Sequence, residues 1–94
     1  MDNFRVIEVI DGDTFVVSPG WEWNNQTGNR VRPAGYDAPE ISTPAGKMAK
    51  TALSNLLLNK TVQLGTAYKV DRGRLVCEVY FNGRNLAEYF KEFK

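Results

Sequence analysis

Histidine is absent from these 94 residues, and its absence excludes several classes of chemistry. Acid–base catalysis by imidazole, Ser–His or Cys–His nucleophiles and the usual zinc sites all depend on it. Cys77 is the only cysteine, so no intramolecular disulfide can form, and its apolar neighbours in the sequence predict a packed thiol. Any catalysis must therefore use carboxylates, lysine, arginine, tyrosine or a metal bound through oxygen.

Long apolar runs are also missing. No stretch approaches the roughly 20 residues that a bilayer-spanning helix needs, so no membrane partner is expected. The first five residues lack the charged and then apolar pattern of a secretion leader. The native location is left open, with the cytoplasm expected only if the chain is full length.

The charge is nearly balanced, with a net value of +1. Proteins that hold nucleic acid by bulk electrostatics are usually far more basic. If this chain acts on a phosphate polymer, it must do so through a local site, and we expect weak, salt-sensitive binding. The length supports one domain over residues 1–94, and we expect a monomer without an obligate protein partner.

The hydrophobic pattern predicts a small, mainly β fold with two helices (α+β). Strands are expected at residues 4–10, 14–17, 30–32, 61–64 and 74–81, with a long hairpin loop at 18–29 and a tight turn at Asn82-Gly83. Short strands of this number must curl and close to bury their inner face, which favours a five-stranded OB-fold barrel. In the loop, Trp21 and Trp23 fit either a local hydrophobic pin or a base-stacking platform.

The two predicted helices have recognisable starts. Thr43 is expected as the N-cap, with Pro44 at the first helical position, and Asn59 as a left-handed stop. Asn85 and Glu88 resemble a capping box that opens a short amphipathic helix running to the C-terminus. The expected buried stripe of the first helix consists of Met48, Ala49, Ala52, Leu53, Leu56 and Leu57.

Three short segments concentrate charge where a simple core-and-surface pattern does not require it. They are Asp11-Gly12-Asp13-Thr14, Arg32-Pro33-Ala34-Gly35-Tyr36-Asp37-Ala38-Pro39-Glu40 and Asp71-Arg72-Gly73-Arg74. Each alone is an ordinary turn, loop or helix approach. Their joint occurrence in this order, with suitable elements between them, favours a functional site.

Grouped carboxylates suit a hard cation such as calcium, which takes about six to eight oxygen ligands. Asp37 and Glu40 flank a proline whose fixed φ stiffens the oxygens around it. Arginine presents a planar fork of donors that matches phosphate oxygens, so Arg32 and Arg74 are candidates to neutralise a developing negative charge. These residue types point to a metal-bound phosphate.

The three segments, together with Val9-Ile10 before the first and Val79–Glu88 further on, resemble the motif blocks of the staphylococcal nuclease (thermonuclease-like) family. The resemblance covers nearly the whole chain. It implies an OB-fold barrel and calcium-dependent hydrolysis of phosphodiester bonds in DNA or RNA. The bond to the 5′ oxygen would be cut, leaving 3′-phosphate ends, and we expect single-stranded nucleic acid to be preferred.

The resemblance also implies roles for the acidic residues. Asp13 and Asp37 would be calcium ligands, joined by the backbone carbonyl of Ala38. The best-known family member has threonine where this chain has Ala38, a change that a carbonyl ligand tolerates. Glu40 would position or deprotonate the attacking water.

Arg32 and Arg74 would contact the scissile phosphate and stabilise its five-coordinate transition state. The segment ending at Arg74 is shorter by a residue than the family's usual pattern, and with a side-chain period of two this can turn Arg74 to the other face. Arg72 is therefore a rival for the second phosphate contact. Pro33 removes a strand donor where relatives usually carry an aliphatic residue.

A calcium-dependent nuclease is thus the leading hypothesis, with two alternatives. One is a non-catalytic, nuclease-like OB module that only binds nucleic acid, although such a module would not need three acids facing a polyanion. The other is a truncated nuclease with impaired activity, because the sequence stops at Lys94 where catalytic relatives continue with a further segment.

Overall fold

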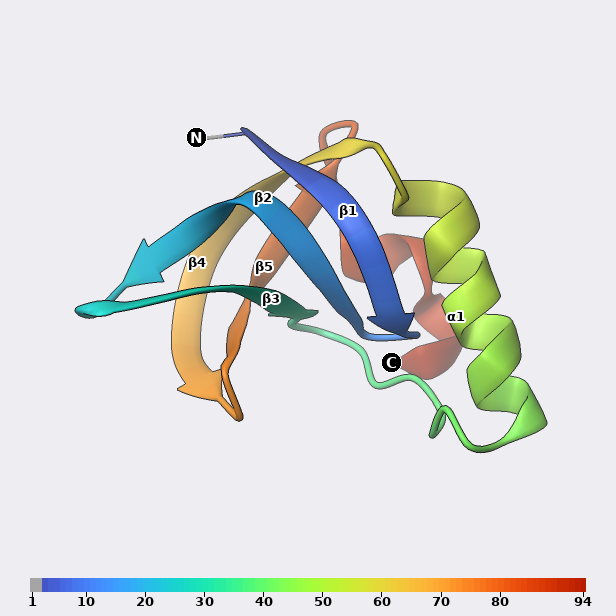
Figure 1. Cartoon of the computed structure of the whole chain (residues 1–94). Coiled ribbons are helices and arrows are strands. Elements are labelled where there is room, and N and C mark those ends of the chain that lie inside the picture. The colour runs from blue at the N-terminus through green and yellow to red at the C-terminus, as the bar shows by residue number, and fades with distance from the viewer. Residues whose placement is uncertain (1–2) are drawn as a thin grey trace.

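The computed structural model of the chain describes residues 3–94. The first two of the five residues that were considered for a secretion leader lie outside the described range. Its strands and helix follow in the order β1 (Asn3–Asp11), β2 (Thr14–Trp23), β3 (Gln26–Pro33), α1 (Pro44–Leu57), β4 (Thr61–Asp71), β5 (Arg74–Phe81) and β6 (Arg84–Asn85). Two 3₁₀ turns, η1 (Leu86–Tyr89) and η2 (Lys91–Phe93), complete the described chain. Figure 1 shows α1 lying beside the curved strands, and α1 packs mainly against β1.

The strands close into a barrel. Their hydrogen-bonded order is β3-β2-β1-β4-β5-β6, and an additional parallel pairing joins β3 to β5. This pairing runs from Arg30 opposite Arg74 to Pro33 opposite Cys77. The predicted mainly β, five-stranded OB-type barrel is confirmed, and β6 adds only a two-residue pairing to β5.

The barrel interior is filled by alternating strand residues. In β5 every second side chain is buried, as the sequence pattern predicts, and these are Leu75, Cys77, Val79 and Phe81. Cys77 is fully buried, and burial raises the pKa of its thiol to about 12. It is a packed thiol.

The predicted long loop at residues 18–29 is wrong. Strand β2 continues to Trp23 and β3 begins at Gln26, so the connection is a tight turn at Asn24-Asn25. A bulge between Val16 and Trp21 absorbs the irregular stretch that suggested a loop. Trp21 is buried and its Nε1 donates to the carbonyl oxygen of Arg30 at 2.8 Å, which makes it a core residue and not a base-stacking platform.

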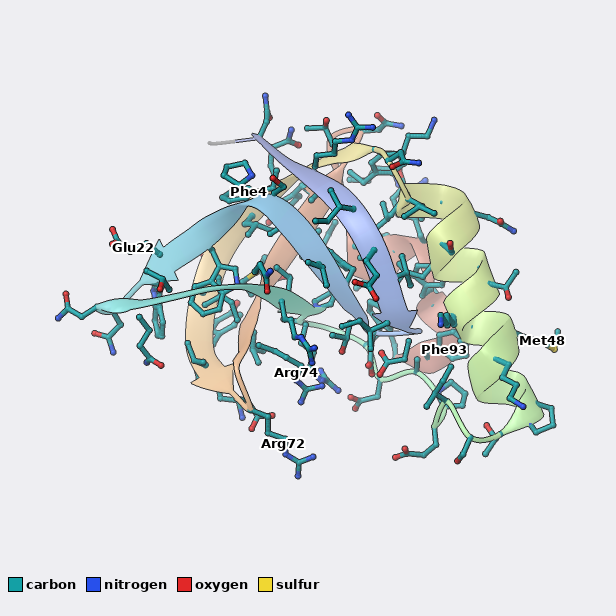
Figure 2. The ribbon with its side chains drawn as sticks, viewed as in Figure 1. Phe4, Glu22, Met48, Arg72, Arg74 and Phe93 are labelled. Atoms are coloured by element: carbon teal, nitrogen blue, oxygen red, sulfur yellow. The ribbon has the colours of Figure 1, made fainter. Side chains whose placement is uncertain are left out.

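Helix α1 begins and ends as predicted, and Ala49, Leu53 and Leu57 of the predicted stripe are buried as expected. The Thr43 hydroxyl accepts a hydrogen bond from the Gly46 amide at 3.0 Å, and Asn59 has φ of 65°. Met48 and Ala52 are exposed, and Figure 2 shows Met48 pointing away from the barrel. The buried residues are Gly46, Ala49, Leu53 and Leu57. Within residues 3–94, no helix has the length and apolar character to cross a membrane.

The second predicted helix is also wrong, because the C-terminal segment forms two short 3₁₀ turns. The Asn85 side chain does cap the first turn, accepting from the Ala87 amide at 2.9 Å. Glu88 does not complete the capping box; it pairs with Lys91 and Lys94 instead. A segment this short cannot sustain an α-helix by itself, so packing decides its geometry.

Candidate functional site

The first acidic segment is the tight turn between β1 and β2. The Asp11 carboxylate accepts a hydrogen bond from the Asp13 amide at 3.0 Å, which is an Asx turn. A Cβ atom on Gly12 would lie 2.6 Å from the Ala38 Cβ and 2.7 Å from the Ala49 Cβ. Only glycine lets this turn lie so close to the following loop and to α1.

The second acidic segment is the loop of residues 34–40 between β3 and α1. Gly35 adopts φ of 101°, which a residue with a side chain rarely does, and the chain changes direction there. The Asp37 amide donates to the carbonyl oxygen of Phe93 at 2.9 Å. The Ala38 amide donates to Asp13 Oδ2 at 3.1 Å, so the two acidic segments are bonded directly.

The end of this loop is fixed by the start of α1. The Glu40 carbonyl oxygen accepts hydrogen bonds from both the amide and the hydroxyl of Thr43, at 3.0 and 2.7 Å. The same hydroxyl accepts from the Gly46 amide. The helix cap therefore holds the backbone of Glu40, while its side chain stays exposed to solvent.

Arg32, near the end of β3, links both acidic segments. Its guanidinium donates to Asp13 Oδ2 at 3.4 Å and to Asp37 Oδ1. Burial lowers the pKa of Arg32, but these carboxylates outweigh burial and raise it overall. Burial raises the pKa of Asp13, with a further contribution from Asp11, against the opposing effects of the Ala38 amide and Arg32.

Arg74 reaches the same region from β5. The parallel pairing of β3 with β5 puts Arg74 and Arg32 on one face, outside the barrel. Arg74 donates to Asp71 Oδ2 at 3.0 Å and to Thr14 Oγ1 at 3.4 Å. The short β4–β5 turn thus leaves Arg74 on the side of Arg32. Arg72 extends outward from the tip of that turn (Figure 2).

These segments meet around one cavity of about 350 Å³. Every residue proposed from the sequence for metal, water or phosphate lines it, although their roles stay predictions. The lining residues are Asp11, Asp13, Arg32, Asp37, Ala38, Pro39, Glu40, Ile41, Arg72 and Arg74. A neighbouring cavity of about 650 Å³ shares Arg32, Asp37, Arg72 and Arg74 and adds the cations Lys69 and Lys94.

Comparison of the sequence with known proteins identifies the family of the chain. No protein-family model matches the chain. A probable staphylococcal-like nuclease of Oryza sativa subsp. japonica is 40% identical over 60 residues, covering 63% of this chain and 16% of the relative. An uncharacterized endonuclease of Haemophilus influenzae is 33% identical over 82 residues, covering 87% of this chain and 44% of the relative. The chain belongs to the staphylococcal nuclease-like family.

A probable endonuclease of Uncinocarpus reesii extends the match. It is 37% identical over an alignment of 100 residues, covering 81% of this chain and 33% of the relative. The nuclease-like chain therefore spans less than half the length of each of these curated relatives.

The donor set of the nuclease-like site fits a hard cation, since carboxylate and carbonyl oxygens are what calcium binds. Asp13 is largely buried, with 14% of its side chain exposed, whereas Asp37 is 81% exposed and pairs with Arg32. Among residues 3–94, no three acidic or thiol groups form a ready-made metal cage. The acidic residues expected to converge do line one cavity, but they do not form a preassembled metal-binding cluster among the described residues.

Four residues that sequence reasoning did not assign to the site support it. Asp11 holds the Asp13 amide, Thr14 and Asp71 hold Arg74, and Tyr36 bonds to the backbone of Gly12. The role of Asp11 had a local signal, because an aspartate followed by glycine often starts a turn in which its carboxylate accepts a hydrogen bond from the amide two residues later. The contacts of Thr14 and Tyr36 had none, because each joins positions far apart in the sequence.

Proposed function

We propose that this staphylococcal nuclease-like domain is a calcium-dependent nuclease that hydrolyses phosphodiester bonds of DNA or RNA. It would prefer single strands, cut the bond to the 5′ oxygen and leave 3′-phosphate ends. The observation that carries the proposal is the cavity in which carboxylates and guanidinium groups from separate segments meet. The relatives named as nucleases or endonucleases support the same class of reaction.

Asp13 and Asp37, with the backbone carbonyl of Ala38, would hold the metal. When bound there, calcium supplies positive charge that draws in the phosphate and favours ionisation of water. Asp37 is paired with Arg32 in the structure, so one carboxylate serves as a partner for a guanidinium as well as for a cation. Because Asp37 would contact the metal and its partner Arg32 would contact the phosphate, we expect the binding of one to affect the binding of the other.

The remaining residues supply proton transfer and charge. Glu40, the exposed carboxylate in the cavity, accepts the proton of the attacking water, a role that imidazole cannot fill in a chain without histidine. Arg32 and Arg74 donate hydrogen bonds to the phosphate oxygens as negative charge develops.

The test uses an end-labelled single-stranded oligonucleotide with the chain in calcium, in EDTA, and as the variant Glu40→Gln. We expect cleavage in calcium, none in EDTA, and a loss of about 10²- to 10⁴-fold in the variant, the range for a missing general base. Glu22→Gln, at an exposed position on β2, is the matched control and should cut normally. Products should lose their terminal phosphate to a 3′-phosphatase.

The other outcomes select the alternatives. Intact oligonucleotide that remains bound in all tubes would replace the nuclease by a binding module. Calcium binding, measured by calorimetry, without cleavage would show an impaired fragment of a nuclease. Equal rates for Glu40→Gln and wild type would remove Glu40 from the reaction.

A further inference from the structure

Tyr36 is an unusual residue to find beside an acidic site, because it is large, aromatic and almost fully buried. Only 4% of it is exposed, and its ring packs against Phe90 with centroids 5.3 Å apart. Its hydroxyl donates a hydrogen bond to the carbonyl oxygen of Gly12 at 3.0 Å.

The hydrogen bond from Tyr36 to Gly12 joins the two acidic segments of the site. Tyr36 directly precedes Asp37, and Gly12 lies between Asp11 and Asp13. The hydroxyl therefore ties together the two segments that carry the proposed calcium ligands. The bond between the Ala38 amide and Asp13 joins the same two segments on the side of the cavity.

Filling the core does not by itself require the hydroxyl. A phenylalanine ring would pack equally well on Phe90, but it would leave the Gly12 carbonyl without this donor. The chain contains a natural comparison in Tyr89, whose hydroxyl donates to the carbonyl oxygen of Phe81 at 3.0 Å. That bond has the same chemistry and length, but it joins η1 to β5 and touches neither acidic segment.

We propose that Tyr36 is a positioning residue whose hydroxyl sets the distance between the Asp13 and Asp37 carboxylates. The spacing it sets is the one that a cation between the two segments would use. The part of this inference that concerns calcium rests on the proposed function. The part that concerns the spacing of the two segments does not.

The experiment compares Tyr36→Phe with Tyr89→Phe in the whole chain. Calcium affinity is measured by calorimetry with calcium chloride, and opening of the site by hydrogen exchange of the Ala38 amide. In Tyr36→Phe we expect calcium affinity to fall about tenfold, as for other residues that orient metal ligands. Exchange at Ala38 should accelerate by a similar factor, and kcat on the oligonucleotide should fall while KM stays within about twofold. Tyr89→Phe should leave all of these within about twofold of wild type.

Each other result overturns a defined claim. Equal behaviour of the two variants at Ala38 would make Tyr36 a purely structural residue. If wild type neither binds calcium nor cuts, the proposed function fails, while Ala38 exchange still decides the positioning role. If Tyr36→Phe does not fold, Phe90→Leu decides the question, because it keeps the Tyr36 hydroxyl and removes only the ring contact. Exchange at Ala38 in Phe90→Leu should stay within about twofold of wild type, and a rise of about tenfold would show that ring packing, not the hydroxyl, sets the spacing.

Discussion

The β2–β3 and β4–β5 hairpins end in the same kind of turn but use different residues. Both central residues are left-handed in each, with φ of 52° and 63° at Asn24 and Asn25, and 54° and 78° at Arg72 and Gly73. Asparagine and glycine tolerate this backbone, whereas arginine does so at a cost. The difference indicates that the β4–β5 turn gives up some backbone stability and gains a cation beside the acidic cavity.

The contrast continues along the two hairpins. In β2–β3 the large side chain, Trp21, is buried in the barrel. In β4–β5 the large side chain of Arg74 lies outside the barrel and is hydrogen-bonded to Asp71 and Thr14. We therefore expect the Trp21 side chain to control stability and the Arg74 side chain to control the proposed activity.

Trp21→Ala tests the first half of this contrast and should have the largest effect. Removing the buried indole leaves a cavity and removes the hydrogen bond to the Arg30 carbonyl, so the free energy of unfolding should fall by about 3–5 kcal/mol. Urea unfolding followed by circular dichroism measures it. Under conditions where the variant is folded, kcat per folded molecule should match wild type, and a loss of kcat would show that this hairpin also serves the site.

Arg74→Ala tests the second half. We expect kcat to fall about 100-fold, equivalent to about 2.7 kcal/mol of transition-state stabilisation, because the proposed donor to the developing charge is lost. The free energy of unfolding should change by less than about 1 kcal/mol, since the lost ion pair is partly exposed. Initial rates and urea unfolding are measured on the same sample. If Arg72→Ala is instead the more damaging variant, Arg72 makes the second phosphate contact.

A reciprocal exchange at the turns gives the smallest effect. Arg72→Asn should raise the free energy of unfolding by about 0.5–1 kcal/mol by relieving the left-handed backbone, and it should weaken oligonucleotide binding. Asn24→Arg should lower stability by a similar amount and leave binding unchanged. Thermal unfolding and fluorescence anisotropy measure the two quantities. Equal binding losses in both variants would show that general charge, and not the place of the turn, governs binding.

Much of the fold could be predicted because its signals are local. The alternation in residues 74–81, the Thr43 cap and the left-handed Asn59 each follow from a few neighbouring residues. The charged segments could likewise be predicted to serve one site, because turn-forming and charged residues occur together in them. The structure brings all of them to one cavity.

The errors fall where long-range packing overrides local pattern. Trp21 draws a glycine- and proline-containing stretch into β2 because its indole is buried in the barrel. Met48 has the right spacing for a buried stripe, but α1 turns Gly46 and Ala49 inward, where Ala49 lies close to Gly12. The orientation of Arg74 could not be predicted, because it depends on a pairing between strands that are far apart in the sequence.

That parallel pairing of β3 with β5 has a consequence for how the molecule acquires its proposed activity. The antiparallel pairings alone would leave Arg32 on β3 and Arg74 on β5 far apart in the strand order. The parallel pairing, in which Arg74 lies opposite Arg30, brings both arginines to the same part of the barrel surface. The proposed pair of phosphate contacts therefore depends on closure of the barrel. A molecule in which only the β3–β5 pairing opened would keep its antiparallel strand pairs, and we expect it to lose the proposed phosphate binding.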